Sequence, residues 1–212
     1  MPYTTAALVT QVQNKLDDSQ FSPTLIKQFI NDTQREVFNT KQLRFMEAST
    51  TFSTVAGDDE LGVEPTDMQI PIDLRITAPV NFGSKLVFRS YNEIDQWYPV
   101  PSLGVGTPTD WYEFAGNIKL YPTPDQVYTL TLRYQKVPTE LSADADVPQI
   151  PEEFQEILVL GALKRCLEFN DQYDQSAFVD VSVARLLDQM TRRYGLRHAD
   201  GPIMMRINKV IQ

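Results

Sequence analysis

Residues 127–137 read VYTLTLRYQKV and carry the clearest strand pattern of the chain. Apolar and polar residues take alternate positions in this stretch: Tyr128, Leu130, Leu132 and Tyr134 against Thr129, Thr131 and Arg133. Because successive side chains of a strand point to opposite sides of a sheet, the pattern predicts one buried face and one exposed face. The fold must therefore provide an apolar core for the first set.

A turn motif lies just before this strand in the sequence: residues 111–114 and 118–121 flank Ala115-Gly116-Asn117. Small and turn-forming residues between two short β-type stretches favour a tight hairpin. We expect this hairpin and residues 127–137 to form a three-stranded antiparallel meander.

Weaker signals extend the β-rich region toward the N-terminus. Residues 49–55 and 85–89 have the composition of short strands. Residues 70–74 are also expected to be extended, with Pro71 excluding them from the centre of a sheet because proline donates no hydrogen bond. Residues 56–66 are polar and predict a loop.

A short helix is predicted within this region. Ser90 and Glu93 have the spacing of a capping box, in which each side chain binds the other's backbone N–H, so we expect a helix over residues 91–98. A polar loop over residues 138–149 ends the β-rich region.

Helical periodicity marks both ends of the chain. Four stretches repeat apolar residues at three- and four-residue spacing: residues 4–16, 22–43, 150–167 and 175–194. Ser22 and Pro23 form a start signal for the second helix, and Gly195 is expected to end the last one. Residues 150–167 are apolar around much of the helix, which predicts a central position among the helices.

These elements predict an α+β fold, an antiparallel helical bundle formed by the N- and C-terminal helices with a central antiparallel β-rich insertion and an extended C-terminal tail. The predicted parts are residues 1–48 as the first part of the bundle, residues 49–149 as the insertion, residues 150–195 as the second part of the bundle, and residues 196–212 as the C-terminal extension.

The composition restricts the class of protein. The chain has 212 residues and a formal net charge of −9, so as a whole it is repelled by DNA. We expect no membrane partner, because no apolar stretch approaches the roughly 18 residues of a membrane span, and no secretory signal at the N-terminus. Basic residues nevertheless outnumber acidic ones after residue 191: Arg192, Arg193, Arg197, Arg206 and Lys209 against Asp200.

Few side chains suit catalysis. His198 is the only histidine, which excludes a triad or metal cluster built on several histidines. Cys166 lies in the most apolar helix, where a thiol is usually a small buried hydrophobic group. No glycine-rich phosphate loop follows a strand. We therefore expect no enzyme activity and no cofactor.

Two groups of residues leave other kinds of site open. Asp144 and Asp146 have part of the spacing of a calcium loop, although the full pattern is missing. Aromatic residues around Trp97 and Trp111 could stack on sugars or bases, although alternating aromatics in a small sheet more often form its core. A non-catalytic carbohydrate- or ligand-binding module therefore remains an alternative.

Several motifs in sequence order resemble those of the tailed-bacteriophage head-to-tail adaptor (connector, or head completion) family. Residues 25–37, LIKQFINDTQREV, resemble its isoleucine–asparagine helix with the glutamine–arginine–glutamate run, and residues 68–74, MQIPIDL, resemble its leucine–proline–x–aspartate–leucine step. Its hairpin, following strand and third helix are similar to residues 106–112 (GTPTDWY), 116–125 (GNIKLYPTPD), 130–134 (LTLRY) and 150–153 (IPEE). The resemblance covers most of residues 22–170.

This resemblance implies a structural virion protein at the portal vertex, or neck, that is assembled in the host cytoplasm. Its expected partners are further copies of itself in a ring, typically twelve, the portal protein, and a tail or nozzle protein. DNA would pass through the lumen without specific binding, past acidic residues. Another tail-side ring or nozzle subunit is the alternative within the virion.

In such adaptors the C-terminal extension commonly reaches up to the portal. The extension of this chain combines basic residues with alternating apolar ones, and could add as a strand to a partner's sheet. The expected portal-binding residues are Arg197, His198, Ile203, Met205, Arg206, Ile207, Lys209 and Val210.

Overall fold

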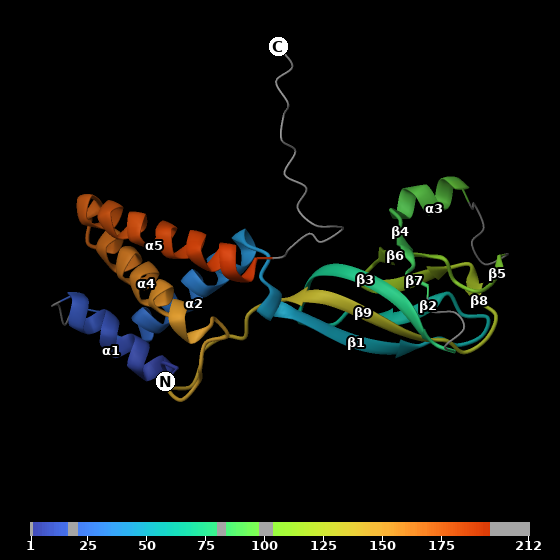
Figure 1. Cartoon of the computed structure of the whole chain (residues 1–212), viewed down its shortest axis with the longest axis horizontal. Coiled ribbons are helices and arrows are strands. Elements are labelled where there is room, and N and C mark those ends of the chain that lie inside the picture. The colour runs from blue at the N-terminus through green and yellow to red at the C-terminus, as the bar shows by residue number, and fades with distance from the viewer. Residues whose placement is uncertain (1, 17–20, 80–83, 98–103, 196–212) are drawn as a thin grey trace, which may run out of the picture.

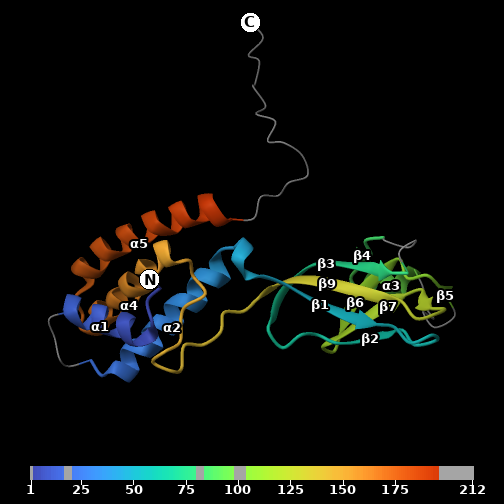
Figure 2. The same cartoon turned by 60° about the horizontal axis from the view of Figure 1, so that its bottom comes forward.

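The computed structural model describes residues 2–16, 21–79, 84–97 and 104–195 and has two lobes along its longest axis (Figure 1). A helical lobe contains α1 (Thr5–Leu16), α2 (Pro23–Thr40), α4 (Glu156–Phe169) and α5 (Tyr173–Tyr194). A β lobe contains the strands and the short helix α3 (Tyr91–Trp97). The view turned by 60° shows the same separation (Figure 2). The predicted α+β class is confirmed, while the four-part division of the chain stays a prediction.

The helices begin where the sequence predicts. The Ser22 hydroxyl accepts a hydrogen bond from the Leu25 N–H at 3.2 Å, and Pro23 occupies the first turn of α2, where its missing N–H costs nothing. α2 ends at Thr40, three residues earlier than expected, because Lys41 is already extended (φ −130°, ψ 131°). A short 3-10 helix, η1 (Arg44–Met46), then leads into the β lobe.

The core of the helical lobe is organised around α4, which packs against α1, α2 and α5. Its apolar side chains are buried almost all round: Ile157, Leu158, Val159, Ala162 and Cys166. At Gly161 the approach to α2 is so close that an added Cβ would lie 2.2 Å from Thr33 Cγ2. α5 is different, because its buried residues Ser176, Val183 and Met190 recur every seventh position and leave most of its surface exposed.

The β lobe contains two larger sheets and a two-stranded pair. The first sheet has the antiparallel order β1 (Glu47–Ser53), β9 (Thr129–Lys136), β3 (Met68–Ala78). The second has the order β2 (Glu60–Val63), β7 (Asn117–Tyr121), β6 (Asp110–Phe114), β4 (Val87–Phe88). The remaining pair is β5 (Val105–Gly106) with β8 (Thr123–Pro124).

Both larger sheets share one apolar core. The alternation predicted for residues 127–137 is confirmed, since Tyr128, Leu130, Leu132 and Tyr134 are all buried. They pack with residues from other strands: Leu74, Ile76, Trp111, Ile118 and Leu120. The helical lobe has a separate cluster of its own.

The predicted three-stranded meander is wrong. β9 pairs with β1 and β3, whereas the β6–β7 hairpin pairs with β2 and β4. The chain changes sheets between β7 and β9, so that the apolar faces of both sheets can meet in one core. Adjacency in sequence therefore gave the wrong partner for β9, because its two neighbours come from distant parts of the chain.

Two further expectations for the β-rich region are corrected. The insertion is not wholly antiparallel, since β4 pairs with β6, and β5 with β8, in parallel. The predicted loop over residues 56–66 contains β2, which buries the side chain of Leu61.

Other local predictions are confirmed. Pro71 lies in β3, which is an edge strand of its sheet, and a residue without a backbone N–H is tolerated there. The hairpin turn uses positive φ at Ala115 (54°) and Gly116 (78°). In the capping box the Ser90 N–H donates to Glu93 Oε2 at 2.9 Å, and the Glu93 N–H donates to Ser90 Oγ at 3.3 Å.

Candidate assembly surfaces

All the expected portal-binding residues lie outside the described residues: Arg197, His198, Ile203, Met205, Arg206, Ile207, Lys209 and Val210. The structure does describe the place from which they leave, at the C-terminal end of α5. The Tyr194 ring packs edge-on against Phe45 at 5.6 Å and against Phe154 at 6.1 Å between ring centroids. Its hydroxyl donates to Glu153 Oε1 at 2.7 Å. The origin of the extension is therefore fixed to the helical lobe beside η1.

Gly195 turns the chain away from α5 as predicted, although it does so without a left-handed conformation. Its backbone is close to the polyproline II conformation (φ −57°, ψ 150°), and it forms an antiparallel bridge with Leu43. An added Cβ would lie 2.4 Å from the carbonyl oxygen of Thr191. Glycine is thus required here for close approach, and the last described residue lies beside Leu43, in the segment that enters the β lobe.

The outer surface of α5 exposes large apolar side chains. Phe178 is 79% exposed, and Tyr173 and Val181 are exposed on the same helix. Phe169, at the end of α4, adds a fourth apolar group. Phe178 and Val181 are three residues apart and share one face of α5. Exposed large apolar groups are candidate contacts with other proteins, and the four residues are called the α5 surface below.

The β lobe has a second exposed apolar set, called the aromatic patch: Val87, Phe88, Tyr91, Trp97 and Phe114. Its rings pack against one another and against the guanidinium group of Arg89. Tyr91 stacks on Phe114 with centroids 4.9 Å apart, and the Arg89 guanidinium lies 4.7 Å from the centroid of Trp97. Trp111 is only 2% exposed and belongs to the core, so it cannot stack on a ligand as the sequence allowed.

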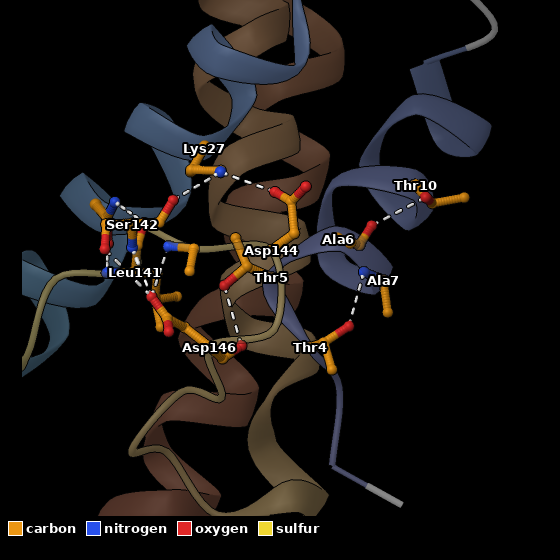
Figure 3. Close-up of polar contacts among 12 residues, drawn as sticks. Thr4, Thr5, Ala6, Ala7, Thr10, Lys27, Leu141, Ser142, Asp144 and Asp146 are labelled. Carbon is orange, nitrogen blue, oxygen red and sulfur yellow. Dashed lines mark hydrogen bonds and ion pairs between the residues drawn. The ribbon is translucent and has the colours of Figure 1, made fainter.

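A polar clasp that no sequence pattern predicted joins residues 139–146 to the first two helices, as Figure 3 shows. Asn31 is buried in α2, where its side-chain amide donates to the Leu141 carbonyl at 3.1 Å and its side-chain oxygen accepts from the Leu141 N–H at 2.9 Å. Lys27 Nζ donates to the Ser142 carbonyl at 2.9 Å and pairs with Asp144 at 3.0 Å.

The same clasp caps the start of α1. The N–H groups of Thr5 and Ala6 donate to the carbonyls of Asp146 at 2.8 Å and Asp144 at 3.1 Å. The first N–H groups of a helix have no partner within the helix, so these carbonyls satisfy donors that would otherwise be unpaired. The clasp thereby fixes α1 and α2 to the segment that leads into α4.

The clasp also accounts for the two aspartates that suggested a calcium loop. Asp146 accepts hydrogen bonds from the N–H groups of Ala143 at 2.7 Å and Ser142 at 2.9 Å, and these bonds lower the pKa of its carboxyl group. Asp144 is paired with Lys27. Both carboxylates thus have partners within the protein. Across the described parts of the chain, no group of three or more acidic, cysteine or histidine side chains is placed to hold a metal ion.

The remaining candidates for a chemical site are Cys166 and a groove between three helices, and the surroundings of both indicate a structural role. Burial raises the pKa of the Cys166 thiol to about 11, so the nucleophilic thiolate is disfavoured. A groove of about 340 Å³ between α2, α4 and α5 is crossed by ion pairs between Lys164 and Asp180 at 2.6 Å and between Arg165 and Glu36 at 2.9 Å. Within the described residues, no helix is both long and apolar enough to span a membrane.

Comparison with known proteins identifies the family. The family model of the SU10 adaptor protein matches residues 3–206, a range that contains every described helix and strand. No curated protein matches the chain. The chain belongs to the SU10 adaptor protein family, a phage head-to-tail adaptor family, which confirms the resemblance found in the sequence.

Proposed function

We propose that the protein is a subunit of an adaptor ring, typically of twelve copies, that joins the capsid portal to the tail of a tailed bacteriophage. The observation that carries the proposal is the family match over residues 3–206, which includes both lobes. The site of action is the neck of the virion, and assembly takes place in the host cytoplasm. The role is structural, without catalysis, cofactor or membrane.

The exposed apolar residues support assembly with other subunits. A closed ring needs two different surfaces on each copy, because each subunit contacts its two neighbours through non-identical faces. The α5 surface and the aromatic patch lie on different lobes, so they can serve different neighbours. In this proposal the helical lobe, as an antiparallel bundle, forms the wall of the ring, and the β lobe faces the tail side or a neighbour.

The C-terminal extension is the proposed portal contact. Its apolar residues Ile203, Met205 and Ile207 alternate, with Arg206 and Lys209 nearby, as in a strand that adds to a partner's sheet. Arg197, His198 and Val210 complete the proposed set. Ordering such a segment costs conformational entropy, which many copies acting together can offset. The anchored end of α5 supports this role, because it gives the extension a fixed origin.

The charge of the chain supports a passive DNA channel. The net charge of −9 is carried mainly by residues before 191, since basic residues are in excess after it. Acidic groups facing a lumen repel phosphates, which would let the duplex slide without binding. A ring structure with a basic lumen would contradict this part of the proposal.

Electron microscopy of the purified chain with and without a portal ring tests the proposal. We expect a ring of adaptor subunits on the portal. Truncation after Gly195 should abolish that complex, while circular dichroism of the truncated chain stays that of the full chain. Absence of binding by the full chain would overturn the adaptor role, and binding by the truncated chain would overturn the role of the extension.

A subunit of another tail-side ring or nozzle is the second candidate, favoured by the aromatic patch as a contact separate from the extension. A chain that binds tail proteins but not the portal would fit this candidate. The carbohydrate-binding alternative has lost one of the two tryptophans that suggested it, because Trp111 lies in the core.

A further inference from the structure

The neck between the two lobes contains a cleft of about 240 Å³. It lies between the C-terminal end of α2, the start of β3 and the end of β9. Many of its side chains are amides or other uncharged polar groups. The residues that matter here are Asn39, Lys41, Gln42, Gln69, Ile70 and Gln135. The cleft therefore combines elements of both lobes, and whatever fills it contacts both.

One side chain in the cleft indicates what should fill it. Gln135 is 4% exposed, and its Nε2 group is buried with no hydrogen-bond partner among the described residues. Its neighbour Gln69 already donates to Asn39 Oδ1 at 2.8 Å. A buried donor without an acceptor is unfavourable, so the cleft is suited to a segment that offers a carbonyl group.

The bridge between Leu43 and Gly195 indicates which segment that is. In antiparallel pairing the residue number falls along one chain as it rises along the other. Continued antiparallel pairing beyond Leu43 and Gly195 would place Gln42 opposite Leu196, and Lys41 opposite Arg197. Lys41 (φ −130°, ψ 131°) and Leu43 (φ −123°, ψ 133°) have the backbone of a strand, as such pairing requires, and Gly195 (φ −57°, ψ 150°) is close to the polyproline II conformation.

We propose that the chain's own residues after Gly195 continue this bridge along Gln42 and Lys41 and enter the neck cleft, where a backbone carbonyl accepts from Gln135. The proximal part of the extension then binds both lobes of its own subunit and sets their relative orientation. In the free chain, Arg197 and His198 of the proposed portal-binding set thus belong to the proximal part, and residues 203–210 remain free for a partner. This inference deepens the proposed function, but it concerns the free chain and does not depend on portal binding.

Disulfide trapping in the full-length free chain tests the pairing. Facing residues of antiparallel strands have Cα atoms about 4.5–5.5 Å apart, which is within the reach of a disulfide. The pair Gln42→Cys with Leu196→Cys should therefore form an intramolecular disulfide under mild oxidation. The native Cys166 can stay, because it is fully buried. The matched control is Gln42→Cys with Ala199→Cys, which tethers nearly the same length of chain in a different register.

The outcomes are distinct. We expect the first pair to close about tenfold faster than the control, since pairing raises the effective concentration of the two thiols. Equal rates would mean a tail that samples all positions, and would overturn the proposal. Disulfides that form only between chains would also overturn it, by assigning the cleft to the extension of a second copy.

Two variants test the details in the same assay. Lys41→Glu replaces a like-charged pair with Arg197 by an opposite-charged one, so it should speed the closure of the Gln42→Cys and Leu196→Cys pair. Gln135→Leu removes the buried donor and should slow it. No change with either variant would contradict the proposed register and the role of Gln135. A negative result in these tests does not bear on the proposed portal binding, because the assay contains no portal.

Discussion

The β lobe forms its core from one continuous stretch of the chain, whereas the helical lobe forms its core from two stretches that are far apart in sequence. The β lobe is built from one continuous stretch, from β1 (Glu47–Ser53) to β9 (Thr129–Lys136). The helical lobe joins α1 and α2 to α4 and α5, whose residues follow only after the β lobe is complete. Contacts between distant residues must overcome a larger loss of chain entropy, so the helical lobe depends on the β lobe to bring its halves together.

The clasp over residues 139–146 follows from this difference. Asn31 and Leu141 are 110 residues apart, yet they exchange two hydrogen bonds. Within the described residues of the β lobe, the sheets provide the corresponding long-range contacts through backbone pairing. The described part of the helical lobe contains no sheet and uses a side-chain amide to fix the returning chain. We therefore expect the two lobes to respond differently to substitution.

The largest effect is expected from Leu132→Ala in the β lobe. Leu132 is fully buried, and its truncation should lower the stability of that lobe by about 2–5 kcal/mol through lost transfer energy and an unfilled cavity. Both tryptophans, Trp97 and Trp111, lie in the β lobe, so their fluorescence reports on it, while the helical signal in circular dichroism reports mainly on the other lobe. Denaturant unfolding should show the fluorescence transition moving further than the helical one.

The control for this comparison is Ile157→Ala, at a fully buried position of α4. It should shift the helical transition more than the fluorescence transition. If both variants shift both transitions equally, the lobes unfold as one unit and the comparison fails.

The next largest effect is expected from Gly161→Ala in the helical lobe. The added methyl group meets Thr33, whose short branched side chain can yield little, so overpacking should cost about 1–3 kcal/mol. The helical signal in thermal or denaturant unfolding measures it. Thr33→Ala in the same chain makes room for the methyl group and should recover part of the loss, at the expense of the bond from Thr33 Oγ1 to the Phe29 carbonyl. Additive losses would show that α2 and α4 do not meet at this point.

Local features of both lobes could be read from the sequence, whereas their long-range partners could not. Ser22, the Ser90–Glu93 capping box and the alternation from Tyr128 to Tyr134 act within a few residues, and all were predicted correctly. The partners of β9 are β1 and β3, and they are selected by the shared core and not by their distance in sequence. A pattern read along the chain carries no information about that choice.

The assembly surfaces divide in the same way. The basic extension could be identified from composition, although its portal role stays a prediction. The α5 surface was not foreseen, because Phe178 and Val181 look like part of an apolar helix until the structure shows which stripe packs on α4. Asn31 gave no signal either, since a polar residue within a helix is usually exposed, and its partner lies 110 residues away.

A smaller effect is expected from Asn31→Ala, which tests the clasp directly. It leaves the N–H and carbonyl groups of Leu141 without their partner, at a cost of about 1–2 kcal/mol. The loss should appear in the helical transition and not in the tryptophan fluorescence. Asn31→Asp keeps the acceptor for the Leu141 N–H but places a buried carboxylate against the Leu141 carbonyl oxygen, so at neutral pH its loss should exceed that of the alanine variant. A shift of the fluorescence transition instead would place the clasp with the β lobe.

The smallest effect is expected from Asp146→Asn, and it should depend on pH. The N–H groups of Ala143 and Ser142 lower the pKa of Asp146 in the folded protein below its unfolded value. Such a group stabilises the fold above its unfolded pKa, which is about 4, and this contribution is lost as the pH falls through the lower folded pKa. The variant should therefore be less stable than the natural chain at neutral pH, and the difference should shrink in acid. Asp144→Asn, which removes only an exposed ion pair with Lys27, is the matched control and should change the stability less at neutral pH. A constant difference between Asp146→Asn and the natural chain from neutral pH to acid would contradict the role of these hydrogen bonds in the clasp.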